Sequence, residues 1–253
     1  MGEEKKLTVL GHLQELRGRL ITSLIVVAVG IGICFPFARY IFDFLTNPVP
    51  GIDLYYTTVT GLLGSYMRVC LYGGLALSMP FLTYQFVMFI RPALTRREKG
   101  YLYTLLPAVI ILFASGVVFC YFILLPPALR FLYYQFPGFV GGDILPWWTV
   151  GDYVSVVTRL LFWLGVVFEI PLVMFFLTKI GVISPQWIAR KWKYAFVMAF
   201  ILGAIITPTF DPINQSLVAA PIIVLYGLGY LLARLARIKR VPIFSHRAEA
   251  EVE

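Results

Sequence analysis

The stretch YAFVMAFILGAIITPTFDPINQSLVAAPIIVLYGLGYLLA, residues 194–233, decides how often the chain crosses a membrane. It is far longer than the roughly 20 apolar residues that one membrane helix needs, and Asp211 is its one charged residue. The segment 207–212, Thr-Pro-Thr-Phe-Asp-Pro, is typical of a turn. The sequence therefore predicts two helices, 194–207 and 213–233. Because about 20 Å of helix precedes the turn and the apolar core of a bilayer is about 30 Å thick, we expect the fifth and sixth helices to be short.

The remainder of the chain is equally apolar. Of its 253 residues 60% are hydrophobic and 13% are charged, against about 25% charged in a soluble domain. Further apolar stretches suited to membrane helices are residues 20–38, 69–90, 101–127 and 160–178. We therefore expect an all-α membrane protein with six transmembrane helices in a single domain, residues 1–238. Residues 239–253 have no apolar periodicity and are predicted to form a disordered tail.

Basic residues give the orientation of these helices. With six spans, all but four of the 21 Lys and Arg fall on one side, and such an excess marks the cytoplasmic side. Both termini are therefore predicted to be cytoplasmic. The other four basic residues are assigned to two outer loops, residues 39–68 and 130–159. These four are Arg39, Arg68, Arg130 and Arg159.

Prolines lie inside four of the predicted spans, at Pro80, Pro107, Pro171 and Pro221. Each removes a helix hydrogen bond and bends its helix. Four bent helices favour a curved, concave bundle. The alternative is that prolines are simply commoner in membrane helices than in soluble ones, and the residues alone leave both interpretations open.

Glu169 is the one ionisable residue within a predicted span. Placing a charge at that depth costs on the order of 3 kcal/mol. One interpretation is structural: an uncharged carboxyl group bonds to a carbonyl, and Pro171 frees the carbonyl of Val167 in the same helix. The other is functional: the group serves a partner helix, a substrate or a proton.

Two carboxylates lie among basic residues on the predicted cytoplasmic side. Glu15 and Arg19 form an i,i+4 pair on an amphipathic helix. Glu98 follows Thr95 at the spacing of a capping box that would open the third span. Both patterns are explained by helix stabilisation alone. The functional alternative is that both carboxylates bind a cationic partner in a cytoplasmic groove.

Other chemistry has no support in the sequence. The two histidines, His12 and His246, lie outside the spans, and no phosphate-binding glycine loop is present. The odd set Cys34, Cys70 and Cys120 has no metal-ligand spacing, and we expect packed, apolar thiols. We therefore predict neither enzymatic activity nor a metal or nucleic-acid site.

Five motifs, in this order along residues 11–237, resemble those of the TatC family, the multispanning subunit of the twin-arginine protein translocase. They are HLQELRGRL at 12–20, SMPFLTYQ at 78–85, FIRPAL at 89–94 with Glu98 behind it, FEIP at 168–171, and the segment from Thr207-Pro208 through Asp211, Gln215, Ala220-Pro221 and Leu225-Tyr226.

The resemblance implies a concave wall of six helices in the cytoplasmic membrane of a prokaryote, without a cofactor. It implies Sec-independent export of folded proteins driven by the proton gradient. The receptor site for the arginines of a signal peptide would include Glu15 and Glu98, shaped by Arg17, Arg19, Phe89 and Pro92. A guanidinium binds carboxylate bidentately, whereas lysine offers a point charge, which explains a preference for arginine.

The resemblance also assigns Glu169 to contact with TatA- or TatB-type single-helix partners, and Pro48 to a sensitive position in the first outer loop. It further implies an oligomeric receptor complex. The sequence departs from the family pattern where Gly227 replaces a frequent glutamate and where Thr58-Val59-Thr60-Gly61 replaces a Thr-Pro-x-Glu segment.

Two functions follow as hypotheses. The first is a signal-peptide receptor and assembly platform for protein export. The alternative is a small-solute secondary transporter with Glu169 as its coupling-ion site, which would account for the buried carboxylate equally well.

Overall fold

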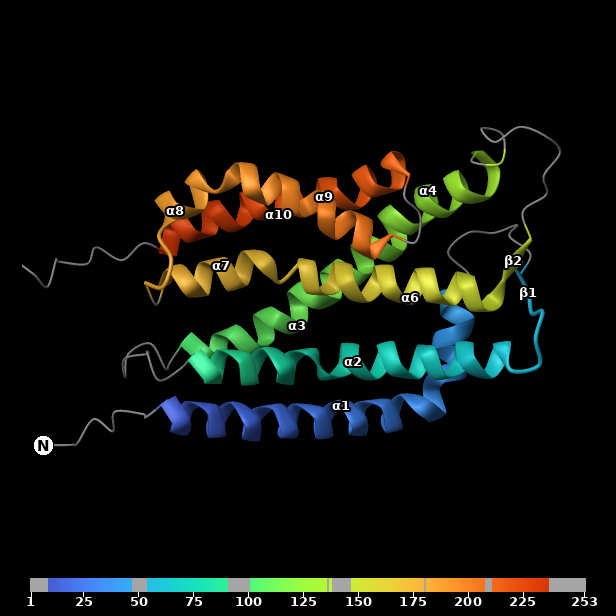
Figure 1. The fold of residues 1–253 in the computed structure, drawn as a ribbon, viewed down its shortest axis with the longest axis horizontal. Helices are drawn as coiled ribbons and strands as arrows, with labels where there is room; N and C mark the ends of the chain where they lie inside the picture. The colour runs from blue at the N-terminus through green and yellow to red at the C-terminus, as the bar shows by residue number, and fades with distance from the viewer. Residues whose placement is uncertain are drawn as a thin grey trace, which may run out of the picture.

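The computed structural model describes residues 9–46, 54–90, 101–135, 137, 147–179, 181–207 and 211–236. Long helices lie side by side along its longest axis (Figure 1). The one sheet in the described part is a parallel pair of two-residue strands, β1 (Leu54–Tyr55) and β2 (Trp148–Thr149), with Leu54 opposite Trp148. The expectation of a helical membrane protein is therefore confirmed, with a small strand pair added at one end.

The first two helices are longer than their apolar runs predicted. Helix α1 spans Val9–Leu45 and α2 spans Gly61–Ile90, against predicted limits of 20–38 and 69–90. Arg39 therefore lies in α1 and Arg68 in α2, so their assignment to the outer loop was wrong. The amphipathic residues that flank the apolar core also adopt helix, because helix propagation continues once it has been nucleated.

The third helical stretch alternates between α-helical and π-helical hydrogen bonding along its length. Helix α3 (Tyr101–Phe119) continues into a π-helical turn, η3 (Cys120–Leu124), then α4 (Leu125–Arg130) and a second π-helical turn, η4 (Phe131–Gln135). The amide of Leu125 donates to the carbonyl of Cys120, five residues earlier. The next two residues are prolines without an amide hydrogen, so the wider turn accommodates them. The predicted end at 127 was too early.

The fourth stretch is broken at Phe168-Glu169. Helix α6 runs Val150–Val167 and α7 runs Ile170–Lys179. The amide of Glu169 donates to Val166, three residues earlier, at 3.1 Å, which tightens the turn. Pro171 has no amide hydrogen to give to Val167, so the predicted disturbance at this proline is present. Arg159 lies inside α6, so its assignment to a loop was wrong.

The last helices are α8 (Pro185–Arg190), α9 (Trp192–Ile206) and α10 (Pro212–Ala236). Helix α9 has 15 residues, about 22 Å of helix, so the prediction of a short fifth helix is confirmed. Helix α10 has 25 residues, and the prediction of a short sixth helix is wrong. In Figure 1 the junction of α9 and α10 stops short of the end that α4 and the start of α6 reach.

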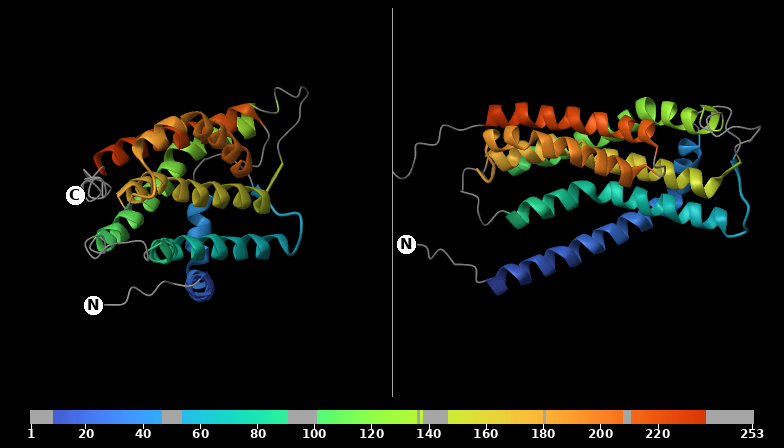
Figure 2. Two further views of the ribbon diagram at one scale, coloured as in Figure 1. Left: turned by 60° about the vertical axis from the view of Figure 1, so that its left-hand side comes forward. Right: turned by 45° about the horizontal axis from the view of Figure 1, so that its top comes forward.

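Neighbouring helices pack most closely where small residues meet. Helix α1 packs on α2, α6 on both α2 and α3, and α10 on both α7 and α9. A Cβ added at Gly74 of α2 would lie 2.5 Å from the amide nitrogen of Ile31 in α1. Such contact between backbones is how membrane helices associate without a hydrophobic driving force. Nearer its N-terminal end, α1 diverges from the other helices (Figure 2).

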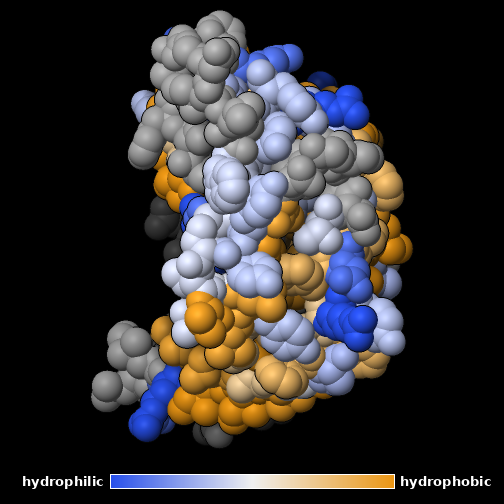
Figure 3. Space-filling model, turned by 90° about the vertical axis from the view of Figure 1, so that its right-hand side faces the viewer, coloured by the Kyte–Doolittle hydropathy of each residue, from blue (hydrophilic) through white to orange (hydrophobic). Residues whose placement is uncertain are grey.

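Four described helical stretches are long and apolar enough to cross a membrane: Gln14–Leu45, Leu106–Gln135, Val150–Lys179 and Pro212–Ala236. The start of α1 and the end of α10 lie at one end of the molecule (Figure 1). Seen from the opposite end, intermediate and hydrophilic residues occupy much of the middle and hydrophobic ones occur towards the rim (Figure 3). This pattern suits a molecule whose sides face lipid. The tail predicted for 239–253 lies outside the described residues.

Candidate functional site

Three side chains join α1 to α2 at the end of the molecule where α1 begins. The Arg19 guanidinium donates from Nε to Oε1 of Glu15 at 3.2 Å, and a second nitrogen of the guanidinium donates to the same oxygen. Its remaining nitrogen donates to Oε1 of Gln85 on α2 at 3.0 Å. The predicted i,i+4 pair is therefore confirmed. Among the described residues the pair uses a single oxygen of the Glu15 carboxylate, so the other oxygen can accept a further donor.

The Glu15–Arg19 pair is partly open to solvent, with side-chain exposures of 27% and 21%. A helical pair of this kind contributes only about 0.3–0.5 kcal/mol to stability. What the pair provides is orientation, because Arg19 also bonds to a second helix. The carboxylate is thereby fixed relative to α2.

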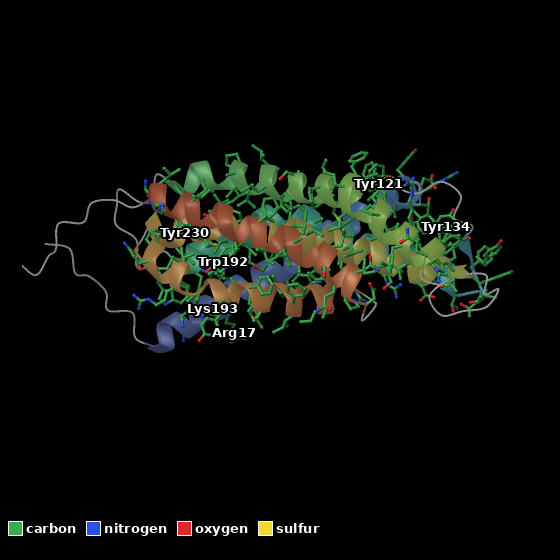
Figure 4. The ribbon with its side chains drawn as sticks, turned by 90° about the horizontal axis from the view of Figure 1, so that it is seen from above. Arg17, Tyr121, Tyr134, Trp192, Lys193 and Tyr230 are labelled. Atoms are coloured by element: carbon green, nitrogen blue, oxygen red, sulfur yellow. The ribbon has the colours of Figure 1, made fainter. Side chains whose placement is uncertain are left out.

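The other predicted members of this site are placed only in part. Arg17 is exposed on α1, at the same end of the molecule as Lys193 of α9 (Figure 4). Phe89 is half-buried in the last turn of α2. Glu98, Pro92 and Pro48 lie outside the described residues. The structure therefore brings Glu15, Arg19 and the end of α2 together and leaves the predicted contribution of the 91–100 segment untested.

A second polar site lies at the break between α6 and α7. Glu169 is 5% exposed, and its Oε2 accepts a hydrogen bond from the Thr83 hydroxyl of α2 at 3.0 Å. Oε1 is buried and has no hydrogen-bond partner among the described residues. The expected partner, the Val167 carbonyl, was wrong, because the carboxyl group faces α2 rather than its own helix.

Gln85 bonds to Arg19 and Thr83 bonds to Glu169, and neither contact was predicted from the sequence. Both lie in the motif at 78–85 and occur near the end of α2. Their signal is polarity within an apolar run, since Thr83 and Gln85 interrupt a hydrophobic helix. The contacts of these two residues join segments far apart in sequence. No local sequence pattern predicts such contacts.

This arrangement binds polar groups. Two carboxylates are each bonded through one oxygen, Glu15 to Arg19 of its own helix and Glu169 to Thr83 of α2, and each can accept donors from a cationic or hydroxyl-bearing ligand. No group of three His, Cys, Asp or Glu side chains suited to a metal occurs in the described part of the chain. Cys34, Cys70 and Cys120 all lie in the described part of the chain, and they are buried free thiols, as predicted. The fold and sites define a polytopic helical membrane protein with binding, rather than catalytic, polar side chains.

The comparisons with known proteins identify the family. The model of the family "Sec-independent protein translocase protein (TatC)" matches residues 11–221. The chain belongs to the TatC family. It is 40% identical to the Sec-independent protein translocase protein TatC of Aquifex aeolicus over 92% of this chain and 97% of that protein. It is 34% identical to the protein of the same name of Carboxydothermus hydrogenoformans, over 94% and 97% of the two chains.

A solved structure agrees in fold. A crystal structure described as a twin-arginine translocase receptor, TatC, superposes with a TM-score of 0.78 at 40% identity, covering 89% of this chain and 99% of that one. The chain is therefore a Sec-independent protein translocase receptor subunit in a membrane and not an enzyme. The alternative of a small-solute secondary transporter is not supported.

Proposed function

We propose that this receptor binds twin-arginine signal peptides at a site built on the carboxylate of Glu15 and completed by Glu98. The observation that carries the proposal is the Glu15–Arg19–Gln85 chain of hydrogen bonds, which holds Glu15 against α2. Helix α2 ends at Ile90, and the segment with Pro92 and Glu98 follows directly. The segment that carries Glu98 thus continues from the helix to which Arg19 ties Glu15.

The chemistry favours arginine as the ligand. Arg19 occupies one oxygen of Glu15, so an incoming guanidinium takes the other and can bridge to a second carboxylate. Guanidinium presents paired donors in a plane, and an ammonium does not. Arg17, Phe89 and Pro92 would shape the site around this position. The apolar part of the signal would lie along the helices.

The test is site-specific photo-crosslinking from positions flanking Glu98 in native membranes, with a twin-arginine signal peptide and its twin-lysine version. We expect crosslinks that need both arginines and that fall about tenfold or more on Glu98→Lys, because repulsion replaces attraction. Glu98→Gln is the matched control that keeps size and loses charge, and it should give an intermediate result. Equal crosslinking of both peptides would refute the proposal.

We also propose that Glu169 is the intramembrane contact for TatA- or TatB-type single-helix partners. Its second oxygen, buried and without a partner in the described chain, needs a donor that a partner helix could bring. A disulfide scan between positions near Glu169 and such a helix tests this. We expect partner crosslinks that weaken on Glu169→Leu, and unchanged crosslinking would count against the contact.

The proposed setting is the cytoplasmic membrane of a prokaryote, with six spans and both termini in the cytoplasm. In support, the start of α1 and the end of α10 share one end of the molecule (Figure 1). Export of folded cargo would draw on the proton gradient, and several receptor copies would assemble into one complex in the lipid bilayer. The concave shape expected from the prolines is part of the same proposal.

A further inference from the structure

Arg159 is a cation within α6, the first part of the stretch Val150–Lys179 that is long and apolar enough to cross a membrane. It lies nine residues after the start of α6 at Val150, about 14 Å along the helix axis. Its side chain is half-buried, and no described residue forms a hydrogen bond or an ion pair with it. A half-buried guanidinium without a partner in the described chain is costly in an apolar stretch, and such residues mark sites where a counter-charge enters.

The side chain lines an open groove between α6, α9 and the start of α10. The groove has a volume of about 730 Å³. Its α9 wall is apolar and includes Val197, Ile201 and Ala204. Those three residues recur at helical spacing, so they form one stripe along α9. The groove is therefore largely apolar, with a single cation in its described lining.

The neutral polar groups of the groove are already bonded within the protein. The Gln215 amide nitrogen donates to the carbonyl of Phe200 at 2.9 Å, and the Thr207 hydroxyl donates to Gly203 at 2.8 Å. The guanidinium of Arg159 is thus the strongest donor that the described lining offers to a ligand.

The short helix brings the membrane surface to this cation. Thr207, which caps the C-terminal end of α9, lines the same groove as Arg159, so this end of α9 and the cation border one cavity. Because α9 supplies about 22 Å of helix and the apolar core is about 30 Å thick, we expect the bilayer beside α9 to thin. Headgroups on this side therefore come down towards Arg159.

We propose that the groove binds one anionic phospholipid, its phosphate paired with Arg159 and an acyl chain along the α9 stripe. Guanidinium and phosphate form charge-assisted, often bidentate hydrogen bonds. A basic pocket between membrane helices is a recognised form of lipid headgroup site. The surrounding bilayer supplies this ligand. The bound lipid would occupy the space beside the short helix α9. The proposal is independent of the signal-peptide site.

The test is native mass spectrometry of the purified full chain, titrated with phosphatidylglycerol or with diacylglycerol carrying the same acyl chains. We expect Arg159→Gln to lower phosphatidylglycerol occupancy about tenfold and Arg159→Lys to lower it less. Arg190→Gln, which removes an exposed charge on α8, is the matched control and should bind as the unchanged protein does. Unaltered occupancy in Arg159→Gln, or equal binding of both lipids, would overturn the proposal.

Two further measurements distinguish loss of the lipid site from misfolding of the Arg159→Gln variant. Ala204→Trp fills the groove without touching the charge, and we expect it to lower phosphatidylglycerol occupancy as well; unchanged occupancy would refute the site. In native membranes, a photoreactive residue at Val197 should give an adduct with the mass of a lipid. An adduct with a protein helix alone would assign the groove to a partner and overturn the lipid proposal.

Discussion

At the scale of single residues, both carboxylates of the proposed sites depend on α2. Arg19 bonds to Glu15 and Gln85 at once, and Thr83 bonds to Glu169. Each contact uses one oxygen of its carboxylate. Helix α2 therefore orients Glu169 directly through Thr83 and Glu15 indirectly through Arg19, and each acid keeps bonding capacity for a ligand.

Arg19→Ala is expected to weaken capture of a twin-arginine peptide about fivefold to tenfold while the melting temperature changes little. The physical reason is that an exposed helical pair contributes little stability, whereas loss of orientation costs affinity. Peptide binding and thermal unfolding of the same preparation measure the two effects. Gln85→Ala should show a smaller effect of the same kind, and a large fall in melting temperature with normal binding would contradict this role.

Thr83→Val is expected to lower the free energy of unfolding by about 1–3 kcal/mol, because it removes the described hydrogen bond of a buried carboxyl group. Valine keeps the shape of threonine, so little packing is lost. Denaturant unfolding in detergent measures the change. In a double-mutant cycle, the same substitution on a Glu169→Leu background should cost much less, and an equal cost in both backgrounds would show that the bond is not the cause.

At the scale of elements, the close approach of α1 and α2 rests on glycine. Gly74→Leu should destabilise the protein by about 1–3 kcal/mol, since the added side chain meets the backbone of α1. The control is Gly64→Leu in the same helix, where an added Cβ meets nothing within 4 Å. Melting temperatures of the two variants in one detergent give the comparison. Equal melting would mean that α1 moves aside at no cost.

Helix boundaries show what local sequence can predict. The existence of the helical stretches, the short α9 and the break between α9 and α10 all followed from apolar run length and from proline and aspartate in sequence. The limits of α1, α3 and α10 did not, because polar residues can extend a helix once neighbouring helices hold it. The length of α10 was misjudged for this reason.

At the scale of the whole molecule, orientation is the testable property. Single cysteines at Arg17 and Lys193, which lie at one end (Figure 4), should react with an impermeant maleimide only from the cytoplasmic side. A cysteine at exposed Tyr56 should react only from the outside. The native cysteines are buried and give little background. Labelling of Arg17→Cys and Lys193→Cys from opposite sides would refute the six-span topology.

The sequence by itself determined that this is a helical membrane protein of the TatC family, and it singled out Glu15 and Glu169 as candidate binding residues. Run length, charge asymmetry and an i,i+4 pair are local patterns, and a chain carries them before it folds. Only the tertiary structure decided that Gln85 bonds to Arg19, that Thr83 bonds to Glu169, and that Arg159 lines a groove beside α9. Those contacts join segments far apart in sequence, so they depend on how the helices pack.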